Sequence, residues 1–187
     1  MSYIPVNNLN KKERDRTPLY FARYLVNRLH QFMGQESVVA ALWCSEDSHY
    51  RELKGVEVWG IQENALRYAG PWPIIAHPPC GPWGMLRHLS FEEDDHGIRA
   101  MELVHQYGGV VEQPSGSQLF KQYAIRPFVT HAPGSEIQVE AGVPHVEVLN
   151  QGDYGHRARK RTLLYWYKPP TILSWVPAAR LRRRPPP

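Results

Sequence analysis

The chain has 187 residues, of which 42% are hydrophobic, and it carries a formal net charge of +4 at pH 7 with a pI of about 9.1. This length and composition suit one domain with a core of its own. The sequence has two cysteines, no cationic-apolar leader and no apolar run near ~18 residues. These features argue against a secreted protein, a disulfide scaffold or a membrane span, so we expect a cytoplasmic protein.

The two ends of the chain differ in composition from its middle. We expect a polar lead-in over residues 1–16, a single α/β domain over 17–170, and a basic tail rich in proline and arginine over 171–187. The domain opens with a predicted helix from Thr17 to Met33, because Thr17 suits the N-cap and Pro18 the first helical position. Apolar side chains recur at helical spacing along it, at Tyr20, Tyr24, Leu25 and Leu29.

Short apolar runs then alternate with polar segments. We predict strands over residues 37–44, 56–61 and 73–77, with a short helix over 45–54 that ends at Gly55. A mostly parallel order follows from this alternation, because each strand would cross over before the next begins.

A second long helix is predicted after the third strand. Ser90 and Glu93 form a capping box for a helix that runs to about Tyr107, and Gly108 and Gly109 end it before a strand over 110–114. The whole pattern predicts an α/β fold with a mostly parallel, Rossmann-like sheet and helices on both faces. In such sheets the functional groups gather at the carboxyl ends of the strands.

The stretch IIAHPPCGPWG, residues 74–84, places Cys80 at one such end. Its two prolines restrict the backbone and present the thiol on a rigid loop, as a nucleophile requires. His77 and Arg87 are the nearest groups that could activate it. The alternative is that Cys80 is a small buried hydrophobe, and we expect that packing role, or the lining of a cofactor pocket, for Cys44.

Basic residues concentrate in HRARKR (156–161) and ARLRRRPPP (179–187). Such clusters are typical of a surface that binds a polyanion, although solvated charges and a disordered tail would give the same composition.

Three motifs resemble those of DNA cytosine-5 methyltransferases, in the same order and at approximately the same spacing. PIIAHPPCGPWG is similar to the catalytic loop of that family, with Cys80 at the nucleophile. GGVVEQPSG resembles the strand whose glutamate contacts the target base, and Glu112 matches that glutamate. HVEVLNQGDYGHRARKRTLLYW resembles the third motif, in which Arg159 and Arg161 match its two arginines. The similarity covers roughly residues 73–167.

The resemblance implies a methyltransferase-type sheet and a covalent mechanism on a pyrimidine of DNA or of a nucleotide. Cys80 would attack C6, Glu112 would donate a proton or a hydrogen bond at N3, and Arg159 or Arg161 would hold the ring carbonyl or a phosphate. A base inside a duplex would have to be flipped out. Further substrate contacts are expected from His77, Pro79, Gln113 and Arg157.

S-adenosylmethionine is the cofactor that the resemblance implies, and methyl transfer to C5 would follow if it binds. The family's first strand runs into a glycine-rich turn, whereas this chain has LWCSEDS, residues 42–48, without a glycine. This argues against a standard pocket. Trp43 and Glu63 are the residues expected to lie at the cofactor, with Glu63 at the ribose.

Only 26 residues follow Arg161 (162–187), whereas the family carries a target-recognition region there. We therefore expect any target recognition to come from a protein partner. Compact enzymes of this kind are typical of phages, which would place the protein in the host cytoplasm.

Three alternatives remain open at this stage. One is other chemistry on the same adduct, such as hypermodification or base removal. Another is a non-catalytic relative that binds nucleic acid or inhibits a host protein. A zinc site from His77, Cys80 and His88 is the third, although no paired Cys-x-x-Cys is present.

Overall fold

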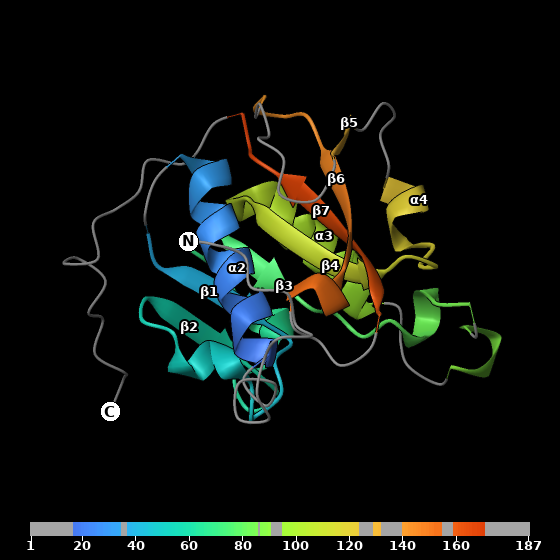
Figure 1. Ribbon diagram of the computed structural model, residues 1–187, viewed down its shortest axis with the longest axis horizontal. Helices are drawn as coiled ribbons and strands as arrows, with labels where there is room; N and C mark the ends of the chain where they lie inside the picture. Colours follow the sequence, from blue (N-terminus) through green and yellow to red (C-terminus); the bar gives the residue numbers. More distant parts are fainter. Residues whose placement is uncertain are drawn as a thin grey trace.

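The computed structural model describes residues 17–34, 37–85, 87–90, 95–123, 129–131, 140–154 and 159–170. The protein is an α/β protein built on one seven-stranded sheet, with the strand order β2-β1-β3-β4-β7-β6-β5 (Figure 1). The strands are β1 (Val39–Leu42), β2 (Val56–Trp59), β3 (Ile74–Ala76), β4 (Gly109–Pro114), β5 (Val129–His131), β6 (His145–Asn150) and β7 (Arg161–Tyr167).

The sheet is mixed, so the expected mostly parallel Rossmann-like sheet is confirmed only in part. Strands β2, β1, β3 and β4 run parallel to one another, and β5 is parallel to β6. Strand β7 runs antiparallel to both β4 and β6. The connection from β6 to β7 contains the 3-10 turn Gln151–Tyr154 where a parallel crossover would need a long connection, so the chain returns beside β6 in the opposite direction.

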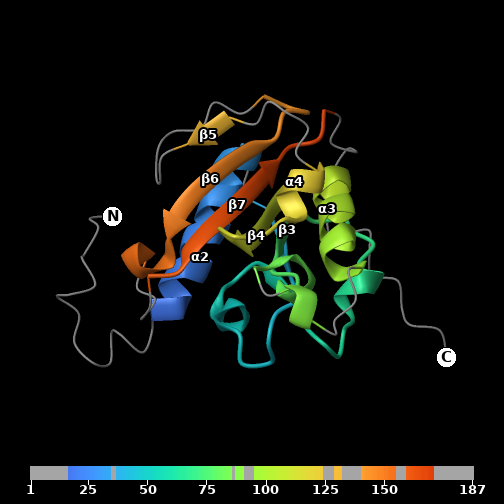
Figure 2. The ribbon, with the colours of Figure 1, turned by 90° about the vertical axis from the view of Figure 1, so that its right-hand side faces the viewer.

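Helices cover both faces of the sheet, as expected (Figure 2). Helix α2 (Thr17–Met33) packs Leu25 and Leu29 in the same core cluster as Val39 and Ala41 of β1. Helix α3 (Asp95–Tyr107) lies on the opposite face, in the cluster that contains Ala40 and Leu42, and the short helix α4 (Leu119–Tyr123) joins it there. Successive residues of β1 therefore face opposite cores.

A buried ion pair connects α2 to strand β6, in the half of the sheet that contains the antiparallel strand β7. Glu147 of β6 is fully buried, with its Oε2 3.7 Å from Arg28 Nε and its Oε1 accepting a 2.9 Å hydrogen bond from Tyr24 Oη. Such a pair fixes the helix in register with β6, because an unpaired buried charge would be costly.

One expected helix differs from the structure, and the start of another falls on residues that are not described. The segment 45–54 forms only the 3-10 turn η2 (His49–Glu52), which the Ser48 side chain caps. Helix α3 is described from Asp95 to Tyr107, and residues 91–94, with the Glu93 of the expected capping box, lie outside the described residues. The stop at Gly108 is confirmed, because its N–H bonds to Val104 O and its φ is +78°, a conformation that favours glycine.

The expected lead-in and tail both lie outside the described residues. Within the part of the chain that is described, no helix is both long enough and apolar enough to cross a membrane.

Candidate functional site

The site begins where β3 and β4 end side by side. Their register pairs Ala76 with Val111, so His77 and Glu112 come next along two adjacent parallel strands. Both side chains turn to the α2 face of the sheet, and His77 Nδ1 lies 3.2 Å from Glu112 Oε2. The rule that functional groups gather at carboxyl edges therefore placed these two residues together.

Three further side chains complete a hydrogen-bonded group, and the sequence alone did not identify them. Gln151 Nε2 donates to Glu112 Oε1 at 3.0 Å, and Lys160 Nζ lies 3.3 Å from the same oxygen. Tyr50 Oη lies 3.0 Å from His77 Nε2. Because ionised Glu112 can only accept, His77 donates its Nδ1 hydrogen to this carboxylate, and its Nε2 lies within hydrogen-bonding distance of the Tyr50 hydroxyl.

Electrostatics keep Glu112 ionised. Burial would by itself raise the pKa of this carboxyl, but the hydrogen bond and charge of His77 and the ammonium of Lys160 outweigh it and lower the pKa to about 2. Burial raises the pKa of Tyr50 well above its usual value, so the phenol stays neutral. The expected role of Glu112 as a proton donor is therefore not favoured, whereas a role as hydrogen-bond acceptor is.

These groups line a pocket of about 480 Å³ between α2 and the carboxyl edge of the sheet, here called the Glu112 pocket. Its polar wall is Glu112, His77, Tyr50, Gln151 and Lys160, and Phe21 and Ala22 of α2 form part of its apolar wall. A cavity of this size with a few convergent polar groups is typical of a small-molecule site.

A second pocket, of about 560 Å³, opens at the ends of β1, β2 and β3, and we call it the Trp43 pocket. It lies where the resemblance implies a cofactor, and Trp43 lines it together with Pro79 and His96. Trp43 adopts a φ of +56°, in the left-handed region that bulky residues rarely enter, and its Nε1–H donates to His96 Nδ1 at 2.8 Å.

The residues present do not fit S-adenosylmethionine in the way that the resembled family holds it. The indole of Trp43 stands where a glycine turn would let the backbone approach the cofactor. Glu63 lines neither pocket, and its carboxylate accepts the Gly60 N–H at 2.8 Å, which lowers its pKa. Glu63 is therefore not at either pocket, where the resemblance would place it against a ribose.

Cys80 is exposed and lies on the loop after β3. Gln113, which is buried, donates from Nε2 to Pro78 O at 2.9 Å and so attaches this loop to β4. The Gly84 N–H bonds to Cys80 O at 2.7 Å and closes the 3-10 turn η4 (Gly81–Trp83). Pro79 lines the Trp43 pocket, whereas Cys80 is not among the residues that line either pocket.

The two cysteines differ in the way expected for a packing residue and an accessible thiol. Cys44 is buried, and burial raises the pKa of its thiol to about 11, so it is a poor nucleophile.

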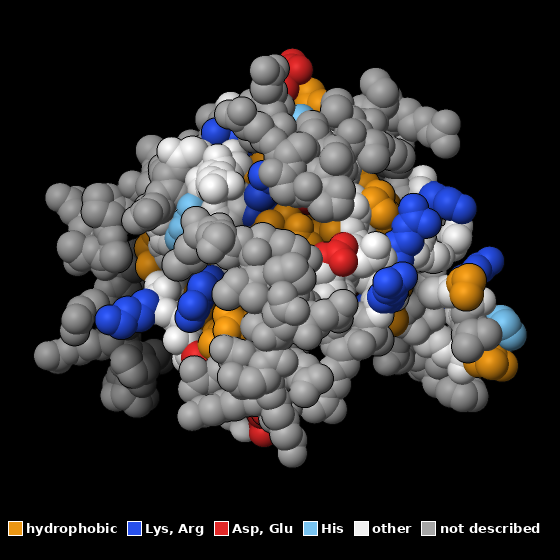
Figure 3. All heavy atoms as spheres, in the orientation of Figure 1, with side chains coloured by type: hydrophobic (Ala, Val, Ile, Leu, Met, Phe, Trp, Pro, Cys, Tyr) orange, Lys and Arg blue, Asp and Glu red, His pale blue; other side chains and the backbone are white. Residues whose placement is uncertain are grey.

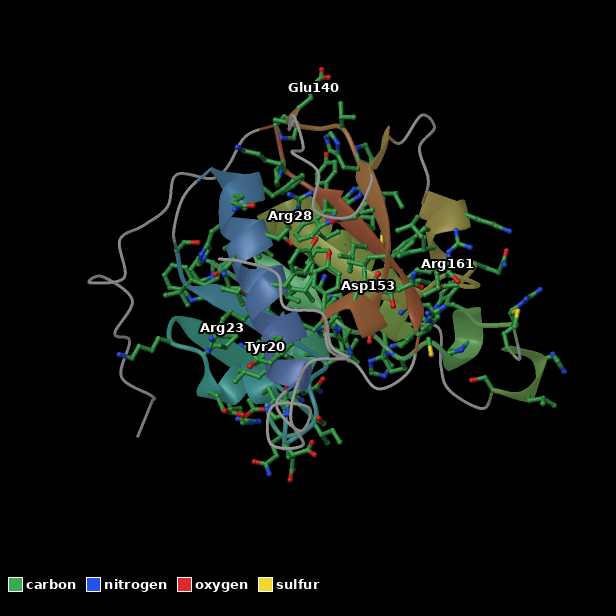
Figure 4. All side chains as sticks on the ribbon, in the orientation of Figure 1. Tyr20, Arg23, Arg28, Glu140, Asp153 and Arg161 are labelled. Carbon is green, nitrogen blue, oxygen red and sulfur yellow. The ribbon has the colours of Figure 1, made fainter. Side chains whose placement is uncertain are left out.

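The basic motif contributes Lys160 to the site and leaves its arginines at the surface. Arg159 and Arg161 are exposed, and Arg157 lies outside the described residues. Arg161 lies at the start of β7, toward the side of the molecule that carries α4 (Figure 4). Figure 3 shows Lys and Arg side chains on that side. Lys121 of α4 is exposed.

The zinc alternative finds no support in the geometry. Among the described residues, no group of three His, Cys, Asp or Glu side chains could hold a metal ion, and His77 is engaged by Tyr50 and Glu112.

No protein-family model, curated protein or solved structure matches this chain.

Proposed function

We propose that the protein is a nucleobase-modifying enzyme that adds Cys80 to C6 of a pyrimidine, in DNA or in a nucleotide. One observation carries this proposal: an exposed thiol sits on a rigid loop that is bonded to the strand bearing Glu112. Two hydrogen bonds make this link, from Gln113 to the Pro78 carbonyl and from His77 to Glu112. A nucleophile and a ring-binding carboxylate would thus be held on one scaffold.

The type of α/β fold is part of the same proposal. The parallel half of the sheet, β2-β1-β3-β4, is compatible with the methyltransferase-type Rossmann-like sheet that the motifs imply, with β7 as its reversed neighbour. We propose that type on this basis.

Cys80 supplies the chemistry by reversible addition. A C6–S bond forms, and the C5–C6 π electrons move to C5, which then takes up an electrophile. With water as the only reactant, that electrophile is a solvent proton. On reversal C5 loses a hydrogen, the C6–S bond breaks and the base is regenerated.

Glu112 would hold the ring by accepting an N–H hydrogen bond, and Arg159 and Arg161 would contact phosphate from the surface. Because Trp43 and Glu63 do not fit S-adenosylmethionine, the proposal ends at the activated C5 and names no transferred group. A protein partner that selects the target sequence is part of the same proposal.

Exchange of the C5 hydrogen tests the addition without any cofactor. Deoxynucleotides and single-stranded oligonucleotides are incubated with the full chain in deuterated water, and loss of the C5 proton is followed by NMR. We expect exchange with the native protein and with Cys44→Ser, and none with Cys80→Ser. Absence of exchange from every pyrimidine tested, with folded protein, would rule out the covalent mechanism.

A second candidate is a non-catalytic module that binds nucleic acid. The surface arginines Arg159 and Arg161 favour it, since exposed cations bind phosphates without any chemistry. Binding of oligonucleotides that survives Cys80→Ser, combined with no exchange, would select this candidate.

A further inference from the structure

We propose that the Trp43 pocket binds a neutral, flat heteroaromatic molecule of the nucleobase or nucleoside class, and that it disfavours charged relatives such as a nucleotide or S-adenosylmethionine. No step of the chemistry proposed for Cys80 uses this pocket. The inference therefore goes beyond the proposed function and does not depend on it.

The pocket has the size and the surface that such a ring needs. Its volume of about 560 Å³ lies in the range of small-molecule sites. A half-buried indole on the wall favours a flat ligand, because a second ring can pack against an aromatic side chain. The apolar side chains of the wall include Trp43, Ile61, Ala65, Leu66 and Pro79.

The wall offers no ionic partner to a charged ligand. Among the described residues that line it there is no Lys, Arg, Asp or Glu. Burial raises the pKa of the Cys44 thiol to about 11, so this side chain is neutral at pH 7. His77 has its Nδ1 3.2 Å from Glu112 Oε2, so a charge on its ring would be matched within the protein. A charged ligand group in this pocket would lose water without gaining a partner of opposite charge.

Two side chains of the wall retain hydrogen-bond donors. The Trp43 indole N–H can only donate, and it bonds to His96 Nδ1 at 2.8 Å. His96 Nδ1 therefore carries no hydrogen in this bond, and the ring hydrogen is on Nε2. Asn64 accepts the Leu66 N–H at its Oδ1, at 3.2 Å, and this bond does not use its amide hydrogens. A heteroaromatic ring has the nitrogen or oxygen acceptors that such donors need, whereas a hydrocarbon ring has none.

The backbone of the same two positions is unusual. In the part of the chain that the structure describes, Trp43 and Asn64 are the non-glycine residues with positive φ, and each has a φ of +56°. Asparagine enters this region readily, but tryptophan rarely does. Both residues line the Trp43 pocket. Strained conformations are typical of ligand sites, so this coincidence supports a binding role for the pocket.

Binding of nucleosides and their charged relatives tests the inference on the native full chain. Affinities for adenosine, inosine, cytidine and uridine, for their 5′-monophosphates and for S-adenosylmethionine are measured by calorimetry at neutral pH. We expect at least one nucleoside to bind with a Kd below about 1 mM. Its monophosphate should bind roughly tenfold more weakly, and S-adenosylmethionine should bind roughly tenfold more weakly than adenosine.

A cation added at the rim should weaken this discrimination. Ile61 lines the pocket and is 85% exposed, so Ile61→Lys introduces an ammonium there without changing the core. We expect the monophosphate to gain roughly two- to fivefold in affinity, as an exposed ion pair allows, and the nucleoside to change little. Leu89→Lys is the matched control, because Leu89 is 63% exposed and lines neither pocket.

A second variant tests the donor. His96→Phe keeps an aromatic ring but removes the Nε2 hydrogen, so the affinity for the nucleoside should fall roughly 3- to 10-fold. His88→Phe changes an exposed histidine that lines neither pocket, and it should bind as the native protein does. If His96→Phe does not fold, the response of the monophosphate to Ile61→Lys still shows whether binding is in this pocket.

Monophosphates or S-adenosylmethionine that bind as tightly as the nucleosides would overturn the inference. So would the absence of nucleoside binding at millimolar concentration, or nucleoside binding that a folded His96→Phe leaves unchanged. These measurements do not involve exchange at C5, so failure of the covalent mechanism would leave this inference standing, and the reverse also holds.

Discussion

The low pKa of Glu112 predicts a specific loss of stability in acid. Its pKa in the folded protein, about 2, lies below the ordinary value of 4.5, so the folded state holds the proton less tightly than the unfolded state does. The difference of roughly 2.5 pH units, at about 1.36 kcal/mol per unit, corresponds to about 3 kcal/mol. That contribution is fully present above pH 4.5 and is lost as the pH falls toward 2.

Replacement of Glu112 by Gln removes this contribution at its source. At pH 7 the variant should be less stable than the native protein by up to about 3 kcal/mol, and the two should converge as the pH falls from about 4.5 to about 2. Urea denaturation at several pH values, followed by circular dichroism, measures the difference. Glu102→Gln, an exposed residue paired with Arg99 on α3, is the control and should change stability by less than about 1 kcal/mol at any pH.

The comparison can fail in two ways. A stability difference that stays constant between pH 7 and pH 3 would show that Glu112 is not held ionised. A Glu112→Gln variant with native stability and a native acid profile would show that His77 and Lys160 contribute no net stabilisation to the carboxylate.

Three other predictions follow from the same geometry. Iodoacetamide should alkylate exposed Cys80 well before buried Cys44, and peptide mass spectrometry that found Cys44 modified first would contradict the assigned exposures. If the surface arginines contact phosphates, replacing Arg159 and Arg161 together by Ala should weaken oligonucleotide binding for all sequences alike and should lower its salt dependence. Titrations at about 50 and about 200 mM salt measure both effects, and an unchanged affinity would show that these arginines do not contact the phosphates. Trp43→Gly should relieve backbone strain of about 1 kcal/mol but lose packing worth about 3 kcal/mol, so its urea midpoint should fall, and a rise would mean that strain dominates.

Local sequence patterns predicted the elements that depend on local signals. Helix α2 and strands β1 to β4 follow apolar periodicity and the glycines that interrupt it, and all five are present, with the strands differing by a residue or a few in length. Strand β5 was not predicted, and the direction of β7 was not either, because direction depends on how the chain returns to the sheet. The short helix over 45–54 had suitable composition, but only η2 formed from it.

The residues of the site can also be divided into those that the sequence pattern placed together and those that it did not. His77 and Glu112 could be placed together because the ends of neighbouring parallel strands meet at one edge. Tyr50, Gln151 and Lys160 could not, because they approach their partners across 27, 39 and 48 residues of sequence. Nothing in the segment around Tyr50 distinguishes it from a packing aromatic residue. Gln151 and Lys160 lie within the third motif, and the Gln151 N–H bonds to Lys160 O at the point where β6 and β7 diverge.

The Glu112 pocket and the Trp43 pocket share one wall, and the residues of this wall determine where a ligand in one pocket could react with a ligand in the other. Trp43, Cys44, Ser45 and His77 line both the Glu112 pocket and the Trp43 pocket. His77 uses Nδ1 for Glu112 and Nε2 for Tyr50, so both ring nitrogens are occupied, and we expect the ring to position these two partners. A base held at Glu112 and a second molecule in the Trp43 pocket would then lie on opposite sides of this wall. Because the loop carrying Cys80 follows directly from His77 and contributes Pro79 to the Trp43 pocket, any reaction that joins the two ligands would have to take place around this loop.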